Sequence, residues 1–272
     1  MSRLAFRRYV PFVPAYHHIL MILDVWAIIL WSILLAGCSS SNGLRNVYLF
    51  SISYKAKTAT PLTDPLQVNP NIGETFTDAL SRSNSTIQQI NLSHMGMCIQ
   101  LISSTWICAS NAEDLVSDLK GATQSDPFNL VWAADKFRNE SIFYPLIFVA
   151  IIFAFISILL LATFPGWYTV EDSEGGSDTE IKPFPSRPVS RAALALSFLA
   201  ALCSFVSVFW QHIASACAST LFQALTYNTI EVHVGAAAMA CGWLGFVIIC
   251  ASTLGLYILV LSVKSLEMLT EG

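Results

Sequence analysis

Hydrophobic residues are concentrated in four long runs of the chain, separated by more polar stretches. The runs cover residues 19–37, 143–164, 192–213 and 235–263. Each reaches the roughly 17 to 25 residues that a helix needs to cross a hydrocarbon core of about 30 Å. Lipid offers no hydrogen-bond partner to open backbone groups, so the runs are expected to be helices rather than strands. The pattern predicts an integral membrane protein with four helical spans.

The polar stretch between the first two runs, residues 38–142, has the pattern of a folded domain. It contains short segments that are rich in aromatic and β-branched residues and lack helical periodicity, and these indicate strands. Two later segments have a helical pattern, the first preceded by Asn111 as a cap. We predict strands at residues 46–54, 86–92, 96–101 and 105–109, and short helices at residues 112–119 and 128–137.

Charge is scarce, and its placement predicts an orientation. Of the 272 residues, 54% are hydrophobic and 12% are charged, about half the charged share of an ordinary soluble domain. Cytosolic segments next to spans are enriched in Lys and Arg, and such residues flank the spans at Arg3, Arg7, Arg8, Lys182, Arg187, Arg191 and Lys264. We therefore expect cytosolic segments at residues 1–18, 165–191 and 264–272, and outer segments at residues 38–142 and 214–234.

Two local features qualify this topology. The sequence from Leu35 to Cys38 resembles a bacterial lipoprotein cleavage site, so cleavage before Cys38 is the alternative to a first span. The apolar run is longer than the usual 7 to 15 residues of a signal core, which favours the span.

The cytosolic stretch 171–191 is acidic, then basic, and contains three prolines. We expect that stretch to be disordered.

Two cysteines fall on the last two predicted strands of the outer segment, at Cys98 and Cys108. If Ser103 lies at the tip of the turn, the two cysteines face each other across a hairpin, where Cβ atoms are roughly 4.5 to 5.5 Å apart. An exported segment favours a disulfide between them, and two buried free thiols are the alternative. Cys38 and Cys217 lie at outer ends of spans, and their pairing stays open.

Three glycosylation sequons lie in the same outer segment. Asn84 and Asn91 are the candidate acceptors, because Asn139 is only a few residues from the second span.

Only a small number of ionisable residues are candidates for a binding site. Asp24 is the one carboxylate inside a predicted span, and such residues often line ion paths. The alternative is that Asp24 reaches the inner interface or pairs with a nearby cation, namely His17, His18 or Lys264. An acidic group of Glu113, Asp114 and Asp118 is interpreted as a solvated helix face, since it lacks the spacing of a calcium loop.

Enzyme signatures do not occur in the sequence. It has no phosphate-binding glycine loop, no His-Glu-x-x-His pair and no nucleophile elbow. We therefore expect neither catalysis nor a cofactor or metal, and no nucleic-acid partner.

Four short motifs resemble a known family. They are Leu35-Ala36-Gly37-Cys38-Ser39-Ser40, Val47-Tyr48-Leu49, Gly96-Met97-Cys98 and Trp106-Ile107-Cys108. Together with the loop lengths, they resemble the fungal factor-induced calcium-regulator and membrane-fusion family, a branch of the claudin-like superfamily. The resemblance implies that Gly96, Cys98 and Cys108 are motif residues. Claudins proper have Trp just before the first cysteine, where this chain has Met97.

The resemblance also implies a fold and a function. The expected fold is membrane α-helical: a claudin-like left-handed four-helix transmembrane bundle beneath a small antiparallel extracellular β-sheet. The expected function is non-enzymatic support of calcium influx and cell-membrane fusion, at the plasma membrane, during fungal mating or polarised growth. Expected partners are the lipid bilayer, calcium channel components or a protein on an apposed cell, and further copies of the chain. The alternatives are an ion channel or channel subunit, and a structural organiser or adhesion protein of a membrane domain.

Overall fold

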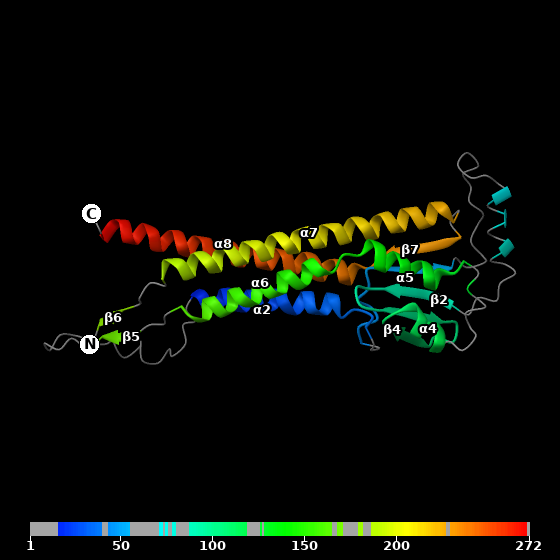
Figure 1. Cartoon of the computed structure of the whole chain (residues 1–272), viewed down its shortest axis with the longest axis horizontal. Helices are drawn as coiled ribbons and strands as arrows, with labels where there is room; N and C mark the ends of the chain where they lie inside the picture. The colour runs from blue at the N-terminus through cyan, green and yellow to red at the C-terminus, as the bar shows by residue number, and fades with distance from the viewer. Residues whose placement is uncertain are drawn as a thin grey trace, which may run out of the picture. The chain divides into compact units, whose positions relative to one another are not determined.

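A computed structural model describes residues 16–39, 43–54, 71–72, 74–75, 78–79, 87–118, 126, 128–164, 168–170, 179–181, 186–226 and 229–270. Within them lie four helices that are long and apolar enough to cross a membrane. These are α2 (Tyr16–Leu35), α6 (Pro145–Ala162), α7 (Arg187–Leu225) and α8 (Ala236–Thr270) (Figure 1). The prediction of four long apolar helices is confirmed, and the protein is a multi-pass membrane protein.

The ends of these helices differ from the predicted runs in one important place. Helix α7 continues past residue 213 to Leu225, although we expected the chain to enter a loop there. Residues 214–225 contain neither glycine nor proline, so nothing in the local sequence stops the helix. Pro145 begins α6, a position where its fixed φ and missing N–H suit the first turn.

Five antiparallel strands form one sheet in the order β4-β3-β2-β1-β7. Strands β1 (Phe50–Tyr54), β2 (Ile87–Leu92), β3 (Met97–Leu101) and β4 (Trp106–Ala109) lie in the four segments predicted as strands. The fifth strand, β7 (Ile230–Val234), comes from the stretch between α7 and α8 and pairs with β1 (Figure 1). Its side chains alternate between buried Ile230 and Val232 and more exposed neighbours, as a half-buried strand requires.

Two short helices accompany the sheet, at α4 (Ala112–Asp118) and α5 (Leu130–Ser141). Asn111 accepts a hydrogen bond from the backbone N–H of Asp114 at 2.8 Å, as expected of a helix cap. Phe137 of α5 packs edge-on against Phe50 of β1, with ring centres 5.1 Å apart. Helix α5 therefore lies against the sheet. We call the sheet with α4 and α5 the sheet domain.

The stretch 171–191, which we expected to be disordered, contains one strand of a two-stranded sheet and the first residues of α7. Strands β5 (Tyr168–Val170) and β6 (Thr179–Ile181) are antiparallel, with Thr169 opposite Glu180. Both strands consist largely of aromatic and β-branched residues, which favour extended backbone. The compositional argument for disorder was therefore wrong for Thr179–Ile181 and for residues 187–191, which begin α7.

The chain divides into two compact units. The first comprises residues 1–29, 148–204 and 245–272. Its described residues include an apolar core of Leu20, Leu161, Phe164, Ala193 and Leu256. The second unit comprises residues 30–147 and 205–244, and so contains the sheet domain together with one end of each of the four long helices.

Candidate functional site

A disulfide closes the hairpin that β3 and β4 form. Cys98 and Cys108 are directly opposite in the register, and their Cα atoms are 4.0 Å apart. The same register pairs Met97 with Ala109, as expected with Ser103 in the turn. The structure therefore contains a Cys98–Cys108 bridge rather than two free thiols. The bridge fixes the register, because a shift by one residue would separate the two cysteines.

Gly96 lies where the β2–β3 turn passes directly over the segment that follows α2. A Cβ atom at Gly96 would overlap the carbonyl group of Cys38. Cys38 is fully buried with a left-handed φ of 52°, and its carbonyl oxygen is 3.9 Å from Cys98 Sγ. A Cβ atom at Gly37 would likewise overlap the carbonyl oxygen of Val47. Neither glycine can gain a side chain unless the neighbouring backbone moves.

The loop after Cys38 also contacts two strands. The Arg45 guanidinium lies 5.5 Å from the ring centre of Trp106 on β4, a cation–π arrangement. The Arg45 carbonyl accepts a hydrogen bond from the Asn91 side chain on β2 at 3.0 Å. Residues that are far apart in the sequence thus meet in one place, which we call the motif cluster: Gly37, Cys38, Gly96, Cys98, Trp106 and Cys108.

A buried hydrogen bond joins the β2–β3 turn to α7. His94 Nε2 and Gln211 Oε1 are 3.0 Å apart, and both side chains are buried. Burial, only partly offset by this hydrogen bond, lowers the pKa of His94 to about 4, so the ring is neutral at physiological pH. With the amide oxygen accepting, His94 donates through Nε2, and its Nδ1 has no partner among the described residues. Sequence reasoning did not single out either residue.

The far end of α7 contacts β7. Ser219 and Gln223 both donate side-chain hydrogen bonds to the backbone carbonyl of Val232, at 2.9 and 3.2 Å. Phe222 packs against Phe137 of α5, with ring centres 6.4 Å apart. The continuation of a spanning helix thus covers the free edge of β7. The only sequence signal for it was the missing helix breaker after residue 213.

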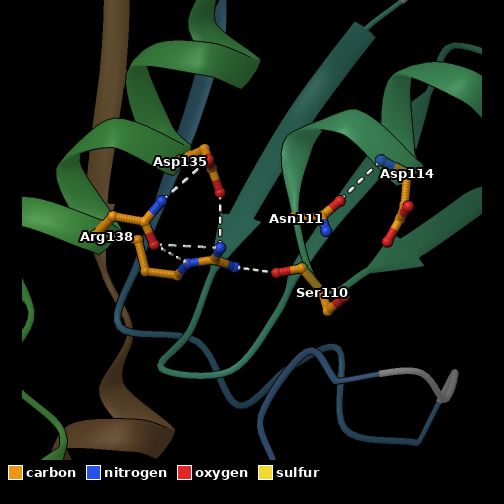
Figure 2. Close-up of polar contacts among 6 residues, drawn as sticks. Ser110, Asn111, Asp114, Asp135 and Arg138 are labelled. Carbon is orange, nitrogen blue, oxygen red and sulfur yellow. Dashed lines mark hydrogen bonds and ion pairs between the residues drawn. The ribbon is translucent and has the colours of Figure 1, made fainter.

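A polar network around Arg138 of α5 stabilises the sheet domain (Figure 2). Arg138 is 9% exposed, and its Nη2 lies 2.7 Å from Asp135 Oδ1. Its Nη1 donates to the backbone carbonyl of Ser110, the residue before the cap Asn111. The network therefore joins α5 to the start of α4. The spacing of three residues between Asp135 and Arg138 is a weak sequence signal for the ion pair. No sequence signal indicated the contact with Ser110.

Asp24 lies in the interior of the bundle. It is fully buried, Ser252 of α8 lies beside it, and neither carboxylate oxygen has a well-formed hydrogen bond to a described residue. The Ser252 hydroxyl donates instead to the Leu20 carbonyl, at 3.4 Å. Among the described residues, Asp24 has no ion pair, so the alternative that it pairs with a nearby cation is wrong for His17, His18 and Lys264. Its role in ion handling stays a prediction.

The two glycosylation candidates have different outcomes. Asn91 is 1% exposed, and the nitrogen that would carry a glycan is the one that donates to Arg45. A glycan on that nitrogen does not fit the folded sheet, so Asn91 was a wrong choice for this state. Asn84 lies outside the described residues.

The remaining candidates are separate from one another. Cys38 and Cys217 are both free, the first buried and the second exposed, so no bridge joins them. Burial raises the pKa of the Cys38 thiol to about 12, which keeps it protonated. Among the described residues, no group of three or more His, Cys, Asp and Glu side chains is arranged to hold a metal ion.

Comparison with known proteins identifies the family. A family model described as Ca2+ regulator and membrane fusion protein Fig1 matches residues 75–262, and no curated protein matches the chain. The matched range contains Gly96, Cys98, Trp106 and Cys108 of the motif cluster and more than half of the chain. The chain therefore belongs to the family of the Ca2+ regulator and membrane fusion protein Fig1.

Proposed function

We propose that this chain is a non-enzymatic plasma-membrane protein that supports calcium influx and cell-membrane fusion in fungal mating or polarised growth. Family membership implies a role in calcium regulation and membrane fusion. The positions of basic residues support cytosolic termini and a sheet domain outside the cell. The bridged antiparallel sheet and the four apolar helices support the claudin-like arrangement with a left-handed bundle.

The observation that carries this proposal is that the sheet domain and one end of every spanning helix form a single compact unit. The His94–Gln211 hydrogen bond and the Val232 carbonyl contacts connect the sheet to α7 within it. A force or contact at the sheet is therefore transmitted to the helix ends through defined bonds. Calcium channel components in the same membrane are the partners that a movement of the helix ends would affect.

The β3–β4 hairpin provides a surface for contact with an apposed cell. Ile102, at its tip, is 67% exposed, the highest value among the large hydrophobic side chains described. Strand β3 begins next to Cys38, so the tip of the hairpin lies at the end that is farther from Cys38. The disulfide holds that tip in place. Ile102→Asp tests the surface without disturbing the core.

A deletion strain tests the proposal directly. Cells that lack the chain should show a reduced calcium-reporter signal and reduced fusion during cell pairing. Re-expression of the wild-type chain should restore both, and Ile102→Asp should restore them only in part at equal surface level. Trp132→Asp is a matched control, because Trp132 is 41% exposed and belongs to α5 rather than to the hairpin. Normal calcium influx and fusion in the deletion strain would refute the proposal.

The principal alternative is that the chain itself conducts calcium. A conducting path needs polar or charged groups along several spans, and calcium takes six to eight oxygen ligands. Among the described residues within the spans, Asp24 is the one buried carboxylate. Purified protein in liposomes should therefore give no calcium flux above that of empty liposomes. Flux from the protein alone would establish the channel alternative instead.

A structural organiser would behave differently again. Its deletion would alter the distribution of neighbouring membrane proteins and leave the calcium signal intact. Imaging of a tagged calcium-channel component in the deletion strain, alongside the reporter, separates this alternative from the proposed function.

A further inference from the structure

Helices α7 and α8 form a groove on the surface of the bundle, within the first compact unit, that the proposed function does not use. Its volume is about 390 Å³, within the range of ligand pockets. Its lining includes Arg191, Leu194, Ala195 and Phe198 of α7, and Leu254 and Tyr257 of α8. The α7 residues recur at spacings of three and four, so they share one helical face.

The surface of the groove is almost entirely apolar, and Arg191 and Tyr257 lie at one end of it. Ala193 and Leu256 belong to the same core cluster, so Arg191 of α7 and Tyr257 of α8 lie at the same level of the bundle. Arg191 is exposed and makes no ion pair with any described residue. Phe198 and Leu254, further along the groove, are 59% and 62% exposed. The groove therefore presents a cation that has no ion pair among the described residues, beside an apolar surface that includes Leu194, Phe198 and Leu254.

We propose that this groove is a binding site for an anionic phospholipid. The acyl chain lies along Leu194, Phe198 and Leu254, and the headgroup phosphate contacts the Arg191 guanidinium, with the Tyr257 hydroxyl as a second donor. Arginine pairs with phosphate through two parallel hydrogen bonds, and basic pockets between spanning helices favour anionic headgroups.

Charge complementarity selects this occupant over others. A sterol would fill an apolar groove but carries no anionic group for Arg191. A zwitterionic phospholipid adds a cation beside the phosphate, which weakens its attraction to a guanidinium. The named lining residues include no Asp or Glu that would neutralise Arg191. Lys264, two turns after Tyr257 on the same helix face, adds to the positive charge near this end.

Native mass spectrometry of the detergent-purified full chain tests the site. The probes are phosphatidylserine and phosphatidylcholine with identical acyl chains, and ergosterol as a third arm. The wild-type protein should retain phosphatidylserine in preference to both. Arg191→Gln should lower phosphatidylserine retention about fivefold, the effect of one cation near an anionic headgroup, and leave phosphatidylcholine unchanged. Ala195→Trp should reduce retention of both phospholipids by filling the groove.

Two matched variants separate the groove from general surface charge. Arg187→Gln removes the same charge from the same helix, and Ala192→Trp adds the same bulk beside the groove; neither residue lines it. Both should bind like the wild type. Equal loss in Arg187→Gln and Arg191→Gln, equal retention of the two phospholipids, or preference for ergosterol would each overturn the proposal. The result is independent of calcium influx, so failure here leaves the proposed function standing.

Discussion

At Gly96 the backbone of the β2–β3 turn touches the backbone that leaves α2. The carbonyl of Cys38 occupies the space where a side chain would begin. Cys38 itself has a positive φ, so it has little freedom to move away. A motif glycine is thus explained by a contact between two chain segments rather than by a catalytic or ligand-binding role.

Gly96→Ala should destabilise the protein by about 2 to 3 kcal/mol, since the new methyl group meets backbone that cannot rotate aside. Thermal unfolding of purified protein in detergent measures this change. Gly242→Ala is the matched control: the three atoms nearest to its Cβ would be side-chain methyl groups, those of Val208 at 3.2 and 3.3 Å and one of Leu34 at 3.6 Å. Helix propensity favours alanine there by up to about 1 kcal/mol, so its net effect should be small. Equal effects of the two substitutions would contradict the packing at Gly96.

His94 should make stability depend on pH. Its pKa falls from 6.5 in the unfolded chain to about 4 in the folded protein. The unfolded state therefore binds the proton first as the pH drops, and stability is lost between pH 6.5 and about 4. The full loss corresponds to roughly 3 kcal/mol. Unfolding measured at pH 7 and pH 5 should show the decline in the wild type and a much smaller one in His94→Gln. An unchanged pH profile in His94→Gln would mean that another group is responsible.

At the level of single elements, α7 combines two roles. Its first part contributes buried small residues such as Ser197, whose hydroxyl lies 2.8 Å from that of Ser157 on α6. Its last turns leave the apolar run and contact β7 through Ser219 and Gln223. One continuous helix therefore packs in the bundle and also contacts β7 of the sheet domain.

Removing both donors to Val232 should loosen β7 without unfolding the rest. Ser219→Ala/Gln223→Ala deletes two hydrogen bonds worth about 1 kcal/mol each, so amide hydrogen exchange in β7 should become up to about 30-fold faster. Thr220→Ala is the control, because the Thr220 hydroxyl bonds only carbonyls of its own helix, those of Ala216 and Cys217. Unchanged exchange in the double variant would show that β1 alone holds β7.

Features set by local pattern could be predicted from the sequence. The four apolar helices followed from run length, and the β3–β4 register followed from the positions of Cys98 and Cys108. Pairings between distant residues could not be predicted. Strand β7 pairs with β1 although the two are far apart in the sequence, and the Ser53 hydroxyl donates to the Glu231 carbonyl at a separation of 178 residues. No local period marks such a partner, and a five-residue strand carries little signal by itself.

The candidate site was likewise only partly predictable. The motif residues Gly96, Cys98 and Cys108 were identified by resemblance, but their contacts with Cys38 depend on the folded arrangement. Asn91 matched a three-residue sequon, which says nothing about burial. His94 and Gln211 are each ordinary in the sequence, and only the fold places their polar atoms together.

At the scale of the whole molecule, the proposed function assigns the outer contact to the sheet domain and gives the spans the role of holding that domain in the membrane. Loss of the Cys98–Cys108 bridge should destabilise the hairpin by about 2 to 3 kcal/mol, by the loop-entropy relation for a short loop. Replacing both cysteines together avoids leaving a reactive thiol. By contrast, Asp24→Asn keeps the size of a buried side chain that has no ion pair with any described residue.

The most direct test compares these two variants in the deletion strain at matched surface levels, with the calcium reporter read during cell pairing. The account predicts that Cys98→Ser/Cys108→Ser loses most of the calcium signal and most of the fusion, and that Asp24→Asn retains both. Full calcium influx in the double cysteine variant, together with its loss in Asp24→Asn, would contradict the central claim and place the function in the spans.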